Sequence, residues 1–99
     1  MTLLRYEVKV PMRNHTGDSG LHIFTGLAES RTVAIRTARE AYSAAHTAHR
    51  AGCRVPGNRP DGWGASGYRP GWELDWRAAT ATCWEDRYAW CPAGDVAAA

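Results

Sequence analysis

Residues 31–51 carry the strongest helical periodicity in the chain, and this segment constrains the fold more than any other. Ser30 precedes the segment and predicts an N-cap, because its hydroxyl can accept a hydrogen bond from an amide of the first turn. Gly52 follows it and predicts the C-terminal end of the helix. Most residues on the apolar face are small, so the helix can lie close against a sheet. That face comprises Ala34, Ile35, Ala38, Ala41, Tyr42, Ala45, Ala48 and His49.

Two strands are predicted before this helix, because residues 3–10 and 21–28 both alternate with a period of two. Pro11 lacks an amide hydrogen and is expected to end the first strand. Gly26 predicts a bulge or a close backbone approach in the second. The polar residues 11–20 are expected to form a long loop, so that the strands make an antiparallel hairpin. One face of the first strand carries Leu4, Tyr6, Val8 and Val10, and one face of the second carries Leu21, Ile23, Thr25 and Leu27.

The second half of the chain begins with a segment that resists regular structure. Residues 52–71 contain six Gly and three Pro, a composition typical of a loop. Residues 72–81 alternate and predict a third strand with Trp72, Leu74, Trp76 and Ala78 on one face, and the two tryptophans are expected in the core. The spacing of Trp72 and Trp76, four residues apart, also fits a helix. A short helix is expected over about 83–91, because Thr82 and Glu85 have the spacing of a capping box.

This order predicts a single small α/β domain of the α+β type, β-β-α-loop-β-α. We expect a three-stranded, mostly antiparallel sheet with the main helix packed on one face. A chain of 99 residues can bury one modest core, which excludes two domains. The globular domain is predicted to span 1–92, and residues 93–99 are expected to form a disordered tail.

The net charge of +2 conceals an uneven distribution. Residues 31–59 contain six Arg and one Glu, whereas residues 72–99 contain two Arg and five acids. Charges interrupt the first nine residues, where a signal peptide needs an apolar stretch, and no apolar run approaches a membrane span. We therefore expect a cytoplasmic protein without a membrane partner. The three cysteines are an odd number, and thiols stay reduced in that compartment.

A metal site is the first chemical possibility to weigh. His46, His49 and Cys53 would point in similar directions on a helix, and imidazole with thiolate suits Zn²⁺. The chain lacks a CxxC or HxxxH pair, and Gly52 is expected to end the helix before Cys53. We therefore expect no metal and no other cofactor, and a small zinc-binding protein is the second alternative. No phosphate loop, dinucleotide fingerprint or paired catalytic carboxylate motif is found, so we expect no enzyme.

Binding of an acidic partner is the leading hypothesis. Arginines on the polar helix face can contact phosphates, and aromatic rings can stack on unpaired bases. Trp63 is expected to be exposed, because it lies among glycines. The hypothesis is a small binding or regulatory protein that contacts nucleic acid. The alternative is a protein-interaction module or inhibitor, such as an accessory protein of a plasmid, phage or conjugative element. A homodimer is also considered. Either partner would use Arg36, Arg39, Arg50, Arg54, Arg59, Trp63, Tyr68 and Arg69.

Overall fold

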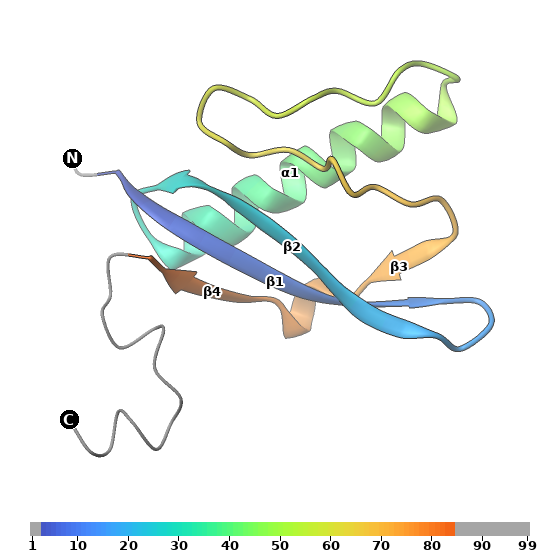
Figure 1. Cartoon of the computed structure of the whole chain (residues 1–99), viewed down its shortest axis with the longest axis horizontal. Helices are drawn as coiled ribbons and strands as arrows, with labels where there is room; N and C mark the ends of the chain where they lie inside the picture. The colour runs from blue at the N-terminus through green and yellow to red at the C-terminus, as the bar shows by residue number, and fades with distance from the viewer. Residues whose placement is uncertain (1–2, 85–99) are drawn as a thin grey trace.

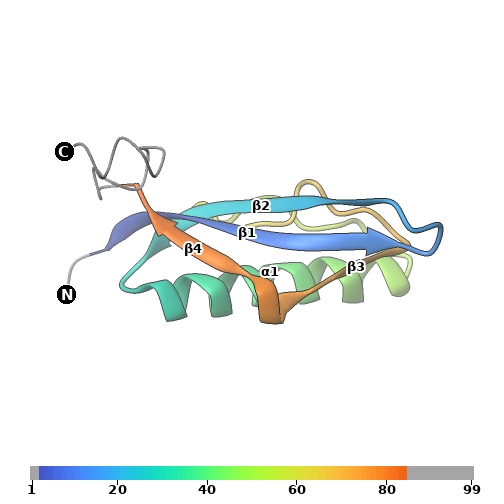
Figure 2. The same ribbon diagram turned by 90° about the horizontal axis from the view of Figure 1, so that it is seen from below.

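The computed structural model describes residues 3–84, which form an antiparallel sheet and a long helix in two layers (Figure 1). α1 lies along one face of the sheet (Figure 2). The α+β class and the antiparallel sheet are confirmed, but the sheet has four strands instead of three. The elements are β1 (Leu4–Asn14), β2 (Ser19–Ala28), α1 (Arg31–Arg50), β3 (Trp72–Leu74), the 3₁₀ turn η1 (Trp76–Ala78) and β4 (Thr80–Cys83).

Both ends of α1 follow the prediction. The Ser30 hydroxyl accepts a hydrogen bond of 3.2 Å from an amide of the first turn. At the other end, Gly52 has a φ of +73° and donates to the carbonyl of His49, while Cys53 donates to the carbonyl of Ala48. This pair of bonds is a Schellman motif, which satisfies carbonyls that the helix itself leaves without donors. Glycine is suited to the position because its left-handed conformation strains other residues.

Only the small residues of the predicted apolar stripe are fully buried: Ala34, Ala38, Ala41 and Ala45. Their lack of bulk lets α1 approach the sheet closely. Ile35, Tyr42 and Ala48 are half-buried. The prediction is wrong for His49, which is exposed and packs against Tyr68 of the following loop, at 5.6 Å between ring centroids.

The β1–β2 hairpin has a tighter turn than predicted. Both strands extend into the expected loop, which leaves only residues 15–18 to reverse the chain. The side-chain oxygen of Asn14 accepts hydrogen bonds from the amides of Thr16 and Asp18. Gly17 takes a φ of +91° between them. These local bonds allow a short reversal in place of the long loop.

Pro11 does not end β1, because it lies where the neighbouring chain is interrupted. β1 pairs with β4 through Lys9 and with β3 from Met12 onward, so residues 75–79 face only two residues of β1. Pro11 therefore has no ladder bond to donate there, and its carbonyl accepts a bond of 2.8 Å from Asp75.

The third predicted strand is accordingly broken in two. The Asp75 carboxylate caps η1 by accepting a 3.1 Å hydrogen bond from the amide of Arg77. The chain then resumes pairing as β4, so the observed order is β-β-α-β-η-β. Cys83 ends β4 instead of starting a helix. The rest of the helix expected over 83–91, and the tail at 93–99, lie outside the described residues.

The inward face of β2 is the less apolar one. In the register with β1, Phe24 pairs with Val8, and His22 pairs with Val10, on the side facing α1. The opposite face, with Leu21, Ile23, Thr25 and Leu27, points away from the helix. The burial of the two β1 valines therefore selects which face of β2 enters the core.

The glycine-rich loop contributes its tryptophan to the core. Trp63 is fully buried, and its indole N–H donates a 2.7 Å hydrogen bond to the carbonyl of Leu27. The ring lies on Gly26, where a Cβ would come within 2.4 Å of it. The expectation of an exposed Trp63 is wrong, and the close backbone approach expected at Gly26 is confirmed. Asp61 adds a backbone bond to Leu27, so the loop covers this end of the β2 edge.

Candidate functional site

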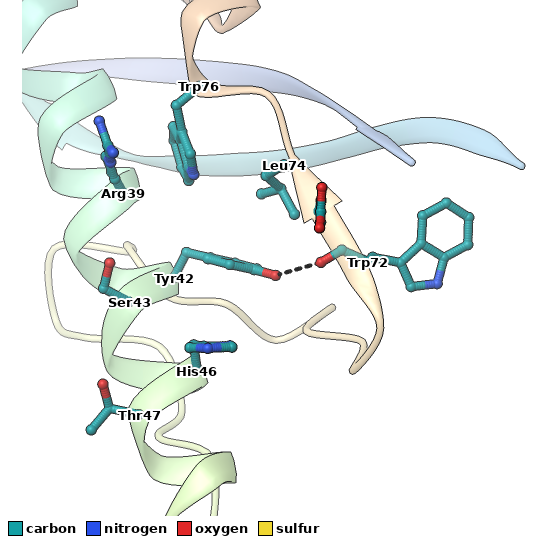
Figure 3. Close-up of a pocket in the computed structure, with 9 residues that line it drawn as sticks. Arg39, Tyr42, Ser43, His46, Thr47, Trp72, Leu74 and Trp76 are labelled. Carbon is teal, nitrogen blue, oxygen red and sulfur yellow. Dashed lines mark hydrogen bonds between the residues drawn. The ribbon is translucent and has the colours of Figure 1, made fainter. Parts of the chain in front are cut away.

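An open groove of about 530 Å³ runs between α1 and the β3–η1 segment (Figure 3). Its helix side combines a guanidinium with hydroxyl and imidazole groups. Its strand side is mostly aromatic and aliphatic. The lining residues are Arg39, Tyr42, Ser43, His46 and Thr47 from α1, and Trp72, Glu73, Leu74 and Trp76 from the other side.

Tyr42 crosses the groove and joins its two sides. Its hydroxyl donates a 3.4 Å hydrogen bond to the carbonyl of Trp72, as Figure 3 shows. Burial, with a smaller contribution from Tyr68, raises the pKa of Tyr42 above its ordinary value. The hydroxyl therefore stays protonated and able to donate at neutral pH.

The floor of the groove continues into the core through stacked rings. Trp76 packs on Phe24 at 5.6 Å and on Tyr42 at 6.2 Å between centroids. Phe24 in turn stacks on His22 at 4.4 Å, with the two planes within 9° of parallel. These contacts fix the rings, so a ligand would meet a largely preformed surface.

A basic stripe runs along α1 beside the groove. Arg36, Arg39 and Arg50 are all exposed, as predicted. They lie within about 60° of each other around the helix and span about 21 Å along it. Arg39 lines the groove itself, and Ser43 and Thr47 lie between it and Arg50 on the same side.

The structure places Arg59 and Arg69 away from this stripe. Arg59 forms an ion pair with Asp61 at 3.1 Å. Partial burial would raise the pKa of the Asp61 carboxyl, but hydrogen bonds from Arg59 and from the Trp63 amide, with the arginine charge, lower it overall. Arg54 and Arg69 are exposed, and Arg69 lines a different hollow beside β2.

Tyr68 anchors the loop to the end of α1. Its hydroxyl is 3.0 Å from Nδ1 of His46, and its ring lies 5.6 Å from that of His49. Cys53 is exposed and its thiol lies 3.9 Å from the carbonyl of Ala51. Within residues 3–84, no group of three or more His, Cys, Asp or Glu side chains is arranged to hold a metal ion.

Sequence reasoning missed the strand side of the groove. Alternation over 72–81 assigned Trp72, Leu74 and Trp76 to one face of a strand and the tryptophans to the core. All three are half-buried in the structure, because η1 interrupts the strand and opens the space beside α1. The one sequence signal of this break is the spacing of Trp72 and Trp76, which fits a helix as well as a strand.

His22 predicts a pH-dependent stability. Burial, then the charge of Arg69, lowers the pKa of His22 below its ordinary value of 6.5. At this residue the unfolded chain therefore binds a proton more readily than the folded protein does. The stability contributed by neutral His22 is present above pH 6.5 and is lost as the pH falls through the folded-state pKa. Urea unfolding at a series of pH values between neutral and mildly acidic should show the loss, and His22→Gln should reduce it. Equal pH slopes in the two proteins would contradict the assignment.

No family model, curated protein or solved structure matches this chain. In the part of the chain that the structure describes, no helix combines the length and apolar character needed to cross a membrane. The groove and its basic stripe are thus the features from which a function is inferred.

Proposed function

We propose that this protein is a non-catalytic binding protein that holds a single-stranded nucleic acid in the groove between α1 and β3–η1. The observation that carries the proposal is the arrangement of charge and aromatic surface across one groove. Arginines follow its helix side, and the indole of Trp76 lies on the other, whereas the indole of Trp72 points away from α1 (Figure 3). Single-strand binding sites combine these two elements, a basic track for phosphates and aromatic platforms for bases.

The two sides of the groove differ in what they can contact. Arg39, with Ser43 and Thr47, offers a charge and hydroxyl donors to phosphate oxygens. Leu74 and Trp76 offer an apolar surface to a base, and Glu73 on that side would repel a phosphate. The backbone of a bound strand is therefore expected to follow α1, with its bases turned toward β3.

Unpaired bases fit this groove better than a duplex does. Stacking on an indole requires a base whose face is free, and the bases of a double helix already stack on one another. The binding hypothesis made from the sequence thus keeps its helix arginines and exchanges Trp63 for Trp76 as the aromatic contact. Arg36 and Arg50 extend the track beyond the groove at both ends.

We expect Arg39→Ala to weaken binding of a fluorescently labelled, mixed-sequence single-stranded oligonucleotide, measured by anisotropy over a range of salt concentrations. Losing one phosphate contact should reduce the salt slope by about one. Trp76→Ala should raise Kd by about 5- to 150-fold through lost stacking, worth about 1–3 kcal/mol. Arg13→Ala is the matched control, because Arg13 is exposed in the hairpin and does not line the groove.

Three results would contradict the proposal. They are no oligonucleotide binding at low salt, equal losses for Arg39→Ala and Arg13→Ala, or tighter binding of the matching duplex. A protein ligand, the alternative from the sequence, would show strong dependence on Trp76 with little dependence on salt.

A further inference from the structure

β2 forms an edge of the sheet, on the opposite side from the groove. Leu27 directs its N–H and C=O away from β1, since they bond to Asp61 and to the Trp63 indole. Backbone groups of a strand alternate in direction, so Ser19, Leu21 and Ile23 direct theirs outward as well. No hydrogen bond to these outward groups is found within residues 3–84.

The open part of this edge has defined limits. At Thr25 the loop closes over the strand, since Gly62 lies against Thr25 and Gly26. At the other end is the hairpin turn. Between them the side chains of Leu21 and Ile23 are 54% and 52% exposed, and a hollow of about 270 Å³ lies beside them. The free stretch is therefore Ser19–Ile23, with Leu21 at its centre.

This stretch lacks the features that keep strand edges apart. Protein edges are commonly protected by charged side chains, proline or bulges. β2 contains no charged residue and no proline over Ser19–Ala28. In an antiparallel pair of identical strands each residue can meet its own copy, so a charge near the centre would repel itself. The sequence of β2 imposes no such repulsion.

We infer that a second copy of this chain pairs with β2 along Ser19–Ile23, antiparallel and with Leu21 opposite Leu21 on a two-fold axis. The two Leu21 residues exchange their N–H···O=C bonds, and each Ile23 lies opposite the partner copy's Ser19. Gly20 of the second copy then lies opposite His22, where it brings no side chain against the buried ring.

Charge supports this register. Continuing it by two residues places Asp18 of the second copy opposite Phe24, on the side of the sheet that faces α1. Arg69 lines the hollow at this edge, beside Leu21, His22 and Ile23. The Asp18 carboxylate accepts hydrogen bonds within its own turn through Oδ2. In this register it lies at the same edge as the guanidinium of the other copy, twice by symmetry, so the opposite charges attract. The second copy fits better than an arbitrary extended peptide, because it supplies both the uncharged centre and this acid.

Sedimentation velocity of the full chain over a concentration series tests the pairing. The wild-type protein is expected to shift from monomer to dimer as concentration rises. Leu21→Lys should remain monomeric at every concentration, because it places two like charges opposite each other on the axis. Leu3→Lys is the matched control, since Leu3 is also exposed, at 57%, and lies outside β2. It should dimerise like the wild type.

Cross-linking tests the register even where Leu21→Lys fails to fold. Hydrogen-bonded antiparallel partners have Cα atoms about 5.5 Å apart, within the range that a disulfide spans. In a chain with Cys53→Ser and Cys91→Ser, Leu21→Cys should therefore form a disulfide-linked dimer on mild oxidation. Ile23→Cys in the same background should not, because its partner is Ser19.

A wild-type protein that stays monomeric throughout the series overturns the inference. Equal dimerisation of Leu21→Lys and Leu3→Lys, or stronger cross-linking at 23 than at 21, also overturns it. The groove proposal is tested separately, because Arg39→Ala should leave self-association unchanged.

Discussion

Trp63→Ala is expected to lower the free energy of unfolding by about 3–5 kcal/mol, the usual loss for a large aromatic residue removed from a core. The indole is fully buried and its N–H bonds to the carbonyl of Leu27. Its removal leaves a cavity between the loop and β2, and it also frees that carbonyl. The total stability of small domains is about 5–15 kcal/mol, so this loss is a large fraction of it.

Urea unfolding followed by circular dichroism measures the effect. Trp72→Ala is the matched control, because it deletes the same side chain from a half-buried position in β3. Its midpoint should move much less than that of Trp63→Ala. If the two variants had equal midpoints, Trp63 would not be a core residue and the loop would not be held by it.

Gly26→Ala is expected to destabilise the protein by about 1–3 kcal/mol, the cost of overpacking a filled site. The added methyl group would lie 2.4 Å from Cδ2 and from Cε2 of the Trp63 indole, so the ring or the strand must move. The bond from Nε1 to Leu27 resists that movement. The backbone of Gly26 is not in the left-handed region, so the collision alone causes the loss.

Gly20→Ala on the same strand is the control for this substitution. Its methyl group would meet only the Met12 side chain, with Cε at 3.3 Å and Cγ at 4.0 Å, and the terminal methyl can rotate away. A second comparison is sharper. In a Trp63→Ala background the collision is gone, so Gly26→Ala should have little further effect on the urea midpoint. Additive losses from the two substitutions would contradict the packing described here, because residues in contact are expected to couple.

The sequence was sufficient to place one side of the candidate site and not the other. The helical period correctly put Arg36, Arg39 and Arg50 on one exposed face, because side-chain direction on a helix follows from spacing alone. The same reasoning could not identify Trp72 and Trp76 as groove residues. Their half-burial depends on the interruption at η1, which in turn depends on pairing with Pro11, more than sixty residues away.

The sequence by itself determined the elements whose causes are local. Ser30 and Gly52 set the ends of α1, and the alternation before Pro11 defined the first half of β1, because caps and periodicity act over a few residues. The sequence also marked Gly26 as a place of close approach. It did not identify what approaches, since the ring that fills the space comes from a loop with no periodicity of its own.

Only the tertiary structure decided the burial of Trp63, the inward face of β2 and the continuation of β1 through Pro11. Each depends on a contact between residues far apart in the chain. Trp63 is buried because Gly26 leaves room for its ring and Leu27 accepts its N–H. Pro11 is accommodated because the strand opposite it is interrupted. Such outcomes follow from which partner a residue meets, and local propensity carries no information about that partner.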